Sequence, residues 1–298
     1  MNIKSVTERL MHKEDFSVAD ENPFVERAIA AMNPKGPGAD PVLQRKMAVL
    51  VKHLHAAVDE LQLKESELHA AIDFFTRACK NDDTMFLADM TGVSMRVNDI
   101  TFAVPNGTAP NVIGPLYREN APFMNNPGNL VSDDEPGDHV LISGQVTGTE
   151  GGRPLAGAIL DLWQTDAVGK YENEDPSQPD YNFRRRISTD SDGRYQVHTV
   201  IPGAYEVGNR DTPAADFLVK LGRGRFRPPH IHLLVKCAGY QDLTTMIYFE
   251  GQEKNAEDCI FSCRPQNMAR IESRGDARLP NGKPLRALRF DIVLGAHP

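Results

Sequence analysis

Two histidine pairs of the form His-x-His stand in different settings and predict different chemistry. His53 and His55 lie in a segment of helical periodicity, where residues two apart point about 200° apart and do not meet at one ion. His230 and His232 open the apolar run Leu233–Val235, which is typical of a strand. Because side chains alternate along a strand, these two imidazoles leave the same face, with Cα atoms about 6.5–7 Å apart. That separation suits two bonds of about 2 Å to one metal ion.

The strand pair does not by itself name a metal. Zinc enzymes and several iron enzymes use His-x-His, and no carboxylate is placed to complete a facial triad. The preceding Arg227-Pro228-Pro229 removes two backbone donors and stiffens the entry to the strand. From spacing alone, a metal site is one hypothesis, a zinc hydrolase is one form of it, and two satisfied histidines beside a sheet are the alternative.

Helices are expected in the part of the chain that precedes the strand pair, up to about residue 105. Asn22-Pro23 and Asp40-Pro41 each combine a capping side chain with a proline, which is a helix-start signal. Two further helical segments are expected over residues 66–79 and 84–100. The second start signal is followed by an apolar stripe at three- and four-residue steps: Leu43, Met47, Leu50, Val51, Leu54, Val58 and Leu61.

Strands are expected after about residue 105, where Gly and Pro become frequent and turn clusters separate short β-branched runs. The expected strands are Val140–Val146, Ala158–Trp163, Arg186–Thr189, Tyr195–Val200, His230–Val235 and Thr244–Phe249. This pattern predicts an antiparallel sandwich or barrel. We therefore expect an α+β chain, with a helical domain over residues 1–105 and an antiparallel β-sandwich domain over residues 106–298.

Composition excludes several classes of partner. The chain has 298 residues, with 33 Lys+Arg against 41 Asp+Glu and a formal net charge of −8, which argues against binding nucleic acid or an anionic membrane. No apolar run approaches the roughly 20 residues that span a bilayer. Met1–Phe16 is charged throughout, unlike a signal peptide, and the four cysteines form no CxxC pair. These features predict a cytoplasmic protein with reduced thiols.

The segments around the strand histidines resemble the intradiol ring-cleavage dioxygenases, specifically the branch of catechol 1,2-dioxygenase and hydroxyquinol 1,2-dioxygenase. Four blocks in order carry the resemblance: Gly114–Tyr117; Leu160–Gln164 with Gly169–Tyr171; Phe183–Arg186 with Asp192–Tyr195; and Pro202–Tyr205 with Arg227–His232. With a helical N-terminal region of matching length, the resemblance covers nearly the whole chain. The ordered set is specific, although each block alone is not.

The resemblance implies a non-haem Fe(III) ion held by Tyr171, Tyr205, His230 and His232. Two phenolate oxygens favour Fe(III) over Fe(II). A free tyrosine has a pKa near 10, so a phenol ionises at neutral pH because the trivalent cation stabilises the anion. The resemblance also implies that Tyr205 leaves the metal and accepts a substrate proton, and that Arg227 stabilises developing negative charge.

The implied reaction joins O2 to catechol and cuts the ring between its two hydroxyl-bearing carbons, giving cis,cis-muconate without an organic cofactor. A substrate pocket is implied at Asp89, Val112, Pro115, Leu116, Val207, Met246, Cys259 and Ile260. Met246 departs from the family, whose catechol enzymes commonly have a polar residue there, often Gln. Arg118–Asn120 is also unlike the commonest members. Hydroxyquinol, giving maleylacetate, is the alternative substrate, since Asp89 could recognise a third hydroxyl.

The resemblance further implies that the helical domain joins two subunits into a homodimer, with phospholipid at the interface. The apolar stripe is compatible with this role and equally with an ordinary core. An alternative from another class is a non-catalytic prealbumin-like binding module, since Gly152–Ala158 followed by Asp190–Tyr195 resembles hairpins of such modules. A binding module has no reason to retain two tyrosines together with His-x-His.

Overall fold

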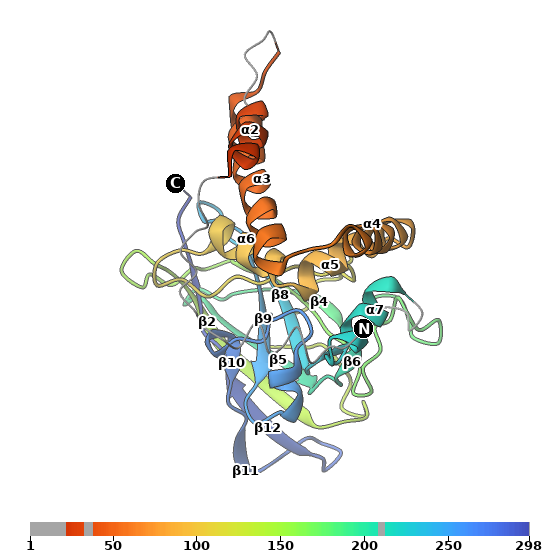
Figure 1. The fold of residues 1–298 in the computed structure, drawn as a ribbon. Coiled ribbons are helices and arrows are strands. Elements are labelled where there is room, and N and C mark those ends of the chain that lie inside the picture. The colour runs from red at the N-terminus through yellow and green to blue at the C-terminus, as the bar shows by residue number, and fades with distance from the viewer. Residues whose placement is uncertain (1–21, 33–37, 208–211, 298) are drawn as a thin grey trace. The chain divides into compact units, whose positions relative to one another are not determined.

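The computed structural model describes residues 22–32, 38–207 and 212–297, so the charged segment Met1–Phe16 lies outside it (Figure 1). The chain divides into two compact units, residues 1–74 and 75–298. This division falls within α4 (Glu65–Lys80), whereas helix gives way to strand after α6 (Val93–Phe102). The boundary expected at residue 105 follows the change of secondary structure, and as a domain boundary it stays a prediction.

In the first unit, α2 (Pro23–Ala31) and α3 (Pro41–Leu61) begin where the cap-and-proline signals predict. Asn22 Oδ1 accepts a hydrogen bond from the backbone N–H of Phe24 at 3.0 Å, and Asp40 Oδ1 accepts one from Val42 at 2.8 Å. No residue of these two described helices is buried. The apolar stripe of α3 is therefore largely exposed in the single chain.

The segment expected as one helix over residues 84–100 forms two, α5 (Thr84–Met90) and α6. Gly92 separates them with φ = 76°, a left-handed conformation that glycine adopts without steric cost. A further helix, α7 (Pro213–Lys220), was not predicted, although Thr212 caps it by accepting a hydrogen bond from Ala215. None of the helices in the described ranges combines the length and apolar character that crossing a membrane requires.

Two sheets form the second unit. One has the order β1-β5-β2-β12-β11, with β13 also paired to β2, and the other has the order β10-β9-β8-β3-β4. The first sheet contains β1 (Gly128–Asn129), β2 (His139–Gly148), β5 (Arg194–Val200), β11 (Glu272–Arg278), β12 (Pro284–Arg289) and β13 (Ile292–Leu294). The second contains β3 (Ile159–Trp163), β4 (Arg184–Ser188), β8 (His230–Lys236), β9 (Leu243–Phe249) and β10 (Met268–Ala269). A two-stranded ribbon, β6 (Tyr205–Glu206) with β7 (Phe226–Arg227), and the 3₁₀ helices Glu253–Glu257 and Pro265–Asn267 complete it.

The sheets correct one expectation. All six predicted strands are present, but the sheets are mixed and not purely antiparallel, because β1 with β5, β12 with β2, β13 with β2 and β10 with β9 pair parallel. Turn sequences between two strands predict a hairpin, in which the neighbouring strands are antiparallel. A parallel pair such as Leu285 opposite His139 joins strands far apart in the chain, so no local turn reveals it.

The main core lies between the two sheets, and β8 is buried on both of its faces. Ile231, Leu233 and Val235 are fully buried in that core. Leu234 belongs instead to a second cluster, with Trp163 and Tyr171. The alternation of β8 thus sends its odd-numbered side chains into the core and presents its even-numbered ones to a different buried space.

Candidate metal centre and substrate site

The imidazoles of His230 and His232 face each other on this second side of β8. Their Nε2 atoms are 3.1 Å apart, and both residues are buried. His230 Nδ1 donates a hydrogen bond to the carbonyl oxygen of Pro228 at 2.7 Å, which leaves the lone pair of the neutral ring on Nε2. Two Nε2 atoms this close make a favourable contact only when one carries a proton or both bind the same cation. The structure therefore confirms that the two imidazoles leave the same face of the strand, as their spacing predicts.

Two phenol rings complete this cluster. The ring centroids of Tyr171 and Tyr205 are 5.4 Å apart with an edge-to-face arrangement. Tyr205 lies 5.7 Å from the His230 ring, and Tyr171 lies 6.4 Å from the His232 ring. Tyr171 arrives from the loop after β3, and Tyr205 from the short strand β6. The structure thus brings together four aromatic rings from three separate segments.

The electrostatics of the four rings fit a cation. Burial raises the pKa of both phenols, Tyr171 and Tyr205, and lowers the pKa of both imidazoles, so the four groups are neutral at neutral pH. Neutral imidazoles are ready metal ligands, and a buried phenol ionises only when a cation stabilises it. A 3.1 Å separation of the Nε2 atoms matches two bonds of about 2 Å that meet at roughly a right angle.

A site built from carboxylates or thiols is not an alternative in the part of the chain that the structure describes. There, no group of three or more His, Cys, Asp and Glu side chains could hold a metal ion. The phenols of Tyr171 and Tyr205 are therefore the donors that can add to the histidine pair. This donor set is hard to intermediate in character and suits a trivalent cation better than zinc.

Trp163 and an ion pair support the rings from outside. Trp163 pairs with His232 across β3 and β8 and stacks on it, with centroids 4.6 Å apart and planes 10° apart. Beside Tyr171, Glu172 accepts from Arg184 Nε and from Arg118 Nη1, each at 2.6 Å. The side chains of Glu172 and Arg184 are 1% exposed. Arg118, in the stretch unlike the commonest family members, thus helps to hold the residue that follows Tyr171.

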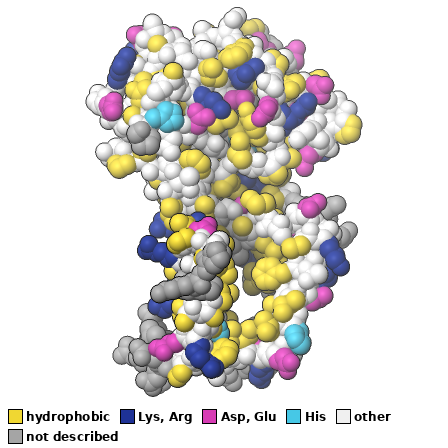
Figure 2. Space-filling view, turned by 90° about the horizontal axis from the view of Figure 1, so that it is seen from above, with side chains coloured by type: hydrophobic (Ala, Val, Ile, Leu, Met, Phe, Trp, Pro, Cys, Tyr) yellow, Lys and Arg dark blue, Asp and Glu magenta, His cyan; other side chains and the backbone are white. Residues whose placement is uncertain are grey.

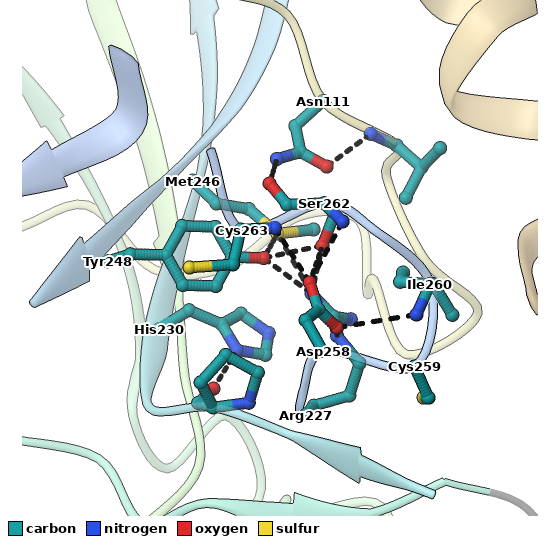
Figure 3. Close-up of polar contacts among 12 residues, drawn as sticks. Asn111, Arg227, His230, Met246, Tyr248, Asp258, Cys259, Ile260, Ser262 and Cys263 are labelled. Atoms are coloured by element: carbon teal, nitrogen blue, oxygen red, sulfur yellow. Dashed lines mark hydrogen bonds and ion pairs between the residues drawn. The ribbon is translucent and has the colours of Figure 1, made fainter. Parts of the chain in front are cut away.

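Arg227 borders the cluster on the other side. It lies directly opposite Tyr205 in the β6–β7 ribbon and is buried. Its Nε donates to Asp258 Oδ1 at 2.9 Å, and its Nη2 donates to Tyr248 Oη and Ser262 Oγ, each at 2.7 Å (Figure 3). A buried guanidinium is thus held beside the phenol of Tyr205.

Four of the residues expected to line a pocket lie near Arg227. Met246 Sδ is 3.3 Å from Arg227 Nη2, and Cys259 and Ile260 directly follow Asp258 in the loop shown in Figure 3. Asp89 is half-buried, which raises its pKa, and the charge of Arg227 acts on it in the opposite direction. These four residues therefore lie toward the arginine end of the site, and their part in binding a substrate stays a prediction.

The other expected pocket residues lie elsewhere around the rings. Leu116 packs against the cluster of Trp163 and Tyr171, and Pro115 precedes it on the surface. Val207 extends the β6–β7 ribbon by donating from its N–H to Arg225 at 2.9 Å. Val112 donates from its N–H to the side chain of Asn111, which in turn donates to Ser262. Their part in binding a substrate stays a prediction.

Three residues of the site were missed by the sequence analysis: Tyr248, Asp258 and Ser262. Tyr248 lies opposite His230 on β9, as Met246 lies opposite His232. The same period-two alternation, applied to the neighbouring strand, would have placed Tyr248 on the face of the histidines. Asp258 and Ser262 stand in a loop, where no periodicity signals a role.

Comparison with known proteins connects this geometry to a family. The family described as "Dioxygenase" matches residues 112–296, and "Catechol dioxygenase N terminus" matches residues 40–109. The 6-chlorohydroxyquinol 1,2-dioxygenase of Cupriavidus pinatubonensis is 33% identical over 224 residues, which are 73% of this chain and 80% of the relative. Catechol 1,2-dioxygenase 2 of Acinetobacter lwoffii is 30% identical over 241 residues, 79% of this chain and 86% of the relative.

Solved structures agree with the sequence relatives. The crystal structure of hydroxyquinol 1,2-dioxygenase from Pseudomonas putida has a TM-score of 0.84 at 28% identity, over 92% of this chain and 98% of that one. That of wild-type catechol 1,2-dioxygenase from Acinetobacter radioresistens has a TM-score of 0.74 at 29% identity, over 92% and 93%. Similar proteins named for two different substrates therefore share the α+β fold of this chain.

Proposed function

The chain belongs to the intradiol ring-cleavage dioxygenases, and from this membership we propose that it cleaves a catechol-type ring with O2 at a non-haem Fe(III) ion. The family uses non-haem iron. Catechol is the proposed substrate and cis,cis-muconate the proposed product. The observation that carries the proposal is the convergence of two buried phenols and two buried imidazoles from distant segments.

Tyr171, Tyr205, His230 and His232 are the proposed iron ligands. When bound, Fe(III) supplies a chelating centre for the two ring oxygens and makes the ring reactive toward O2. The chain contributes a site that is buried and rich in apolar and aromatic walls, which excludes bulk water and strengthens every charge interaction within it. Trp163 orients the His232 ring, and the Glu172–Arg184 ion pair anchors the loop that carries Tyr171.

Tyr205 and Arg227 are the proposed catalytic residues. A phenolate at Tyr205 would accept the proton of a ring hydroxyl on its Oη, because burial raises the pKa of this phenol and so makes its anion a strong base. Arg227 lies opposite Tyr205 and brings a buried positive charge to the same place. It would stabilise negative charge that develops on the ring or on the incoming oxygen.

Hydroxyquinol, cleaved to maleylacetate, is the second candidate reaction. It is favoured by Asp89, whose half-buried carboxylate interacts with the charge of Arg227 and could accept a hydrogen bond from a third hydroxyl. The chain is similar to enzymes named for either ring, so the comparisons do not favour one substrate over the other. Turnover of catechol, chlorocatechols and hydroxyquinol by the purified protein decides between the candidates, and Asp89→Asn should lower kcat/KM selectively for hydroxyquinol if that ring is the substrate.

A visible spectrum tests the proposal as a whole. The iron-loaded protein should be coloured by phenolate-to-Fe(III) charge transfer, and the band should shift when catechol is added without oxygen. A colourless protein with stoichiometric zinc would instead support the zinc hydrolase. The relatives named above are dioxygenases, so the non-catalytic binding module is not proposed further.

We also propose that the helices form a homodimer with phospholipid at its interface. Leu43 is 56% exposed and Leu54 is 57% exposed, so the stripe of α3 offers an apolar surface to a second subunit or to a lipid. The space-filling view in Figure 2 shows hydrophobic side chains gathered at the molecular surface. Light scattering tests the homodimer, and analysis of extracted lipid tests the phospholipid.

A cytoplasmic location stays a prediction.

A further inference from the structure

Arg227 sits in a buried network that uses three of its five N–H groups. Nε donates to Asp258, and the two N–H groups of Nη2 face the hydroxyl oxygens of Tyr248 and Ser262. Nη1 makes no hydrogen bond within the part of the chain that the structure describes. It nevertheless keeps some accessible surface, unlike the fully buried atoms that lack a partner. The guanidinium is thus held from one side, and Nη1 is left as its free donor edge.

Asp258 fixes the hydroxyl of Ser262 directly and that of Tyr248 through Ser262. Ser262 Oγ donates to Asp258 Oδ2 at 2.8 Å, and the same oxygen accepts from the backbone N–H groups of Ser262 and Cys263 at 2.9 and 2.7 Å (Figure 3). Because the single proton of Ser262 Oγ goes to Asp258, the hydroxyl of Tyr248 is the donor in its 2.6 Å contact with Ser262. Every donor in the chain from Tyr248 to Asp258 then has an acceptor, so one arrangement of protons satisfies the network.

The network joins the elements that build the site. Tyr248 lies opposite His230 on β9, and Arg227 lies opposite Tyr205 on β7. The loop from Asp258 is tied to β7 by a hydrogen bond from Cys259 N–H to Phe226 at 3.1 Å. A shift of the guanidinium would therefore disturb contacts with both the ribbon and the loop.

We propose that Ser262, anchored on Asp258, and Tyr248, held through Ser262, are positioning residues that fix the orientation of Arg227 and present its Nη1 edge to an anionic oxygen of the bound ring. The inference rests on the proposed function for the identity of that ring. Loss of one hydroxyl leaves Arg227 buried and charged, with its bond to Asp258 but with only one of the two hydroxyls that hold Nη2. Misplacement of a charge-stabilising group by a small distance can cost about 100-fold in rate.

Hydrogen exchange tests the network without any need for activity. The Arg227 Nε–H signal, assigned by its loss in Arg227→Lys, should exchange at least about 10-fold faster in Tyr248→Phe than in the wild type. Tyr195→Phe is the matched control, because Tyr195 is equally buried and donates to Phe290 at 2.6 Å in the other sheet. Unchanged protection of the Arg227 signal in Tyr248→Phe would overturn the proposal.

Kinetics separate positioning from a general structural role. Tyr248→Phe and Ser262→Ala should each lower kcat about 10-fold or more, with iron content and the visible band of the free enzyme unchanged. In an Arg227→Met background, the same substitutions should change the remaining activity less than about two-fold, because they act through the arginine. Equal losses in both backgrounds would overturn the proposal. Ser262→Ala serves as the second variant should Tyr248→Phe fold poorly.

The outcomes also separate this inference from the proposed function. Should the wild-type protein turn over no catechol-type ring, the proposed function fails, while the exchange of the Arg227 Nε–H still decides whether Tyr248 positions the arginine. Should the wild type be active and Tyr248→Phe match it in kcat and in exchange, the positioning role fails and the proposed function stands.

Discussion

The two sides of the site differ in how their polar groups are satisfied. On the side of Arg227, the guanidinium, the carboxylate of Asp258 and the hydroxyls of Tyr248 and Ser262 satisfy one another. On the side of the rings, two Nε2 atoms face each other at 3.1 Å, and His232 Nδ1 is buried without a partner among the described residues. Apart from Nη1 of Arg227, the groups of the arginine side find partners within the described chain, whereas the ring side suits a cation that the chain does not provide.

This contrast makes the two sides separable by experiment. A change to the rings should alter metal binding and leave the arginine network in place, because that network needs no cation. A change to the arginine side should alter turnover and leave the metal bound. On strand β8, two side chains at period-two spacing on one face, His230 and His232, belong to the ring side. On strand β9, the side chains opposite them, Tyr248 and Met246, belong to the arginine side.

The largest effect is expected from His232→Ala. Removal of one imidazole should abolish stoichiometric iron and the visible band, and should lower kcat/KM for catechol at least about 100-fold, since loss even of groups that only support metal ligands costs 10–100-fold. Metal analysis, the spectrum and steady-state kinetics measure these losses. The exchange of the Arg227 Nε–H should stay as in the wild type. Faster exchange would show that the two sides are not independent.

Glu172→Gln should weaken the ring side through its anchor. It leaves the charge of Arg184 buried without its anion, which should lower the free energy of unfolding by about 3 kcal/mol, measured in urea. Asp180→Asn is the matched control, because this second partner of Arg118 is 87% exposed, so its loss should cost under about 1 kcal/mol. Equal costs for the two variants would contradict the role of Glu172 as a buried anchor.

Arg227→Lys tests the arginine side alone. An ammonium cannot contact Asp258, Tyr248 and Ser262 together with a substrate, so kcat should fall about 10-fold to 100-fold while the iron and its band remain. Arg225→Lys is the control, because Arg225 lies two residues earlier in the chain and pairs with Glu206 outside the network. This variant should retain nearly the wild-type kcat. Loss of iron in Arg227→Lys would argue that the arginine holds the ring side together.

The sequence predicted those parts of the molecule that follow from local rules. Helix starts at Pro23 and Pro41 follow from their caps, and the convergence of His230 and His232 follows from their place on one strand. Parallel pairs such as β2 with β12 arise from distant segments and leave no local trace. The helix at Pro213 carries the same signal of a cap and a proline, so it was predictable and was overlooked.

The candidate site shows the same limit. Spacing placed two of its four rings, because they share a strand, whereas Tyr171 arrives on a loop and Tyr205 on a two-residue strand. Only the resemblance to a family pointed to these tyrosines before the fold was known. Asp258 acquires its role from a loop that folds back on Arg227, which is tertiary information.

The smallest effect concerns a second pair of facing imidazoles, which has no tyrosine ring in contact with it among the described residues. His139 Nδ1 and His198 Nε2 are 3.0 Å apart, and burial lowers the pKa of both. A pKa lowered in the folded state means that protonation favours unfolding, so stability is present above the unfolded pKa of about 6.5 and is lost as the pH falls below it. The melting temperature should therefore fall by a few degrees more between pH 7 and pH 5 in the wild type than in His198→Gln. His139 Nε2 donates to the carbonyl oxygen of Glu135 at 2.9 Å, much as His230 Nδ1 donates to Pro228, so the two histidine pairs differ mainly in their neighbouring phenols. Without those phenols, this pair should bind no iron. Iron retained by His232→Ala and then lost on adding His198→Gln would show instead that facing imidazoles alone suffice, and that the phenols are not what distinguishes the ring side.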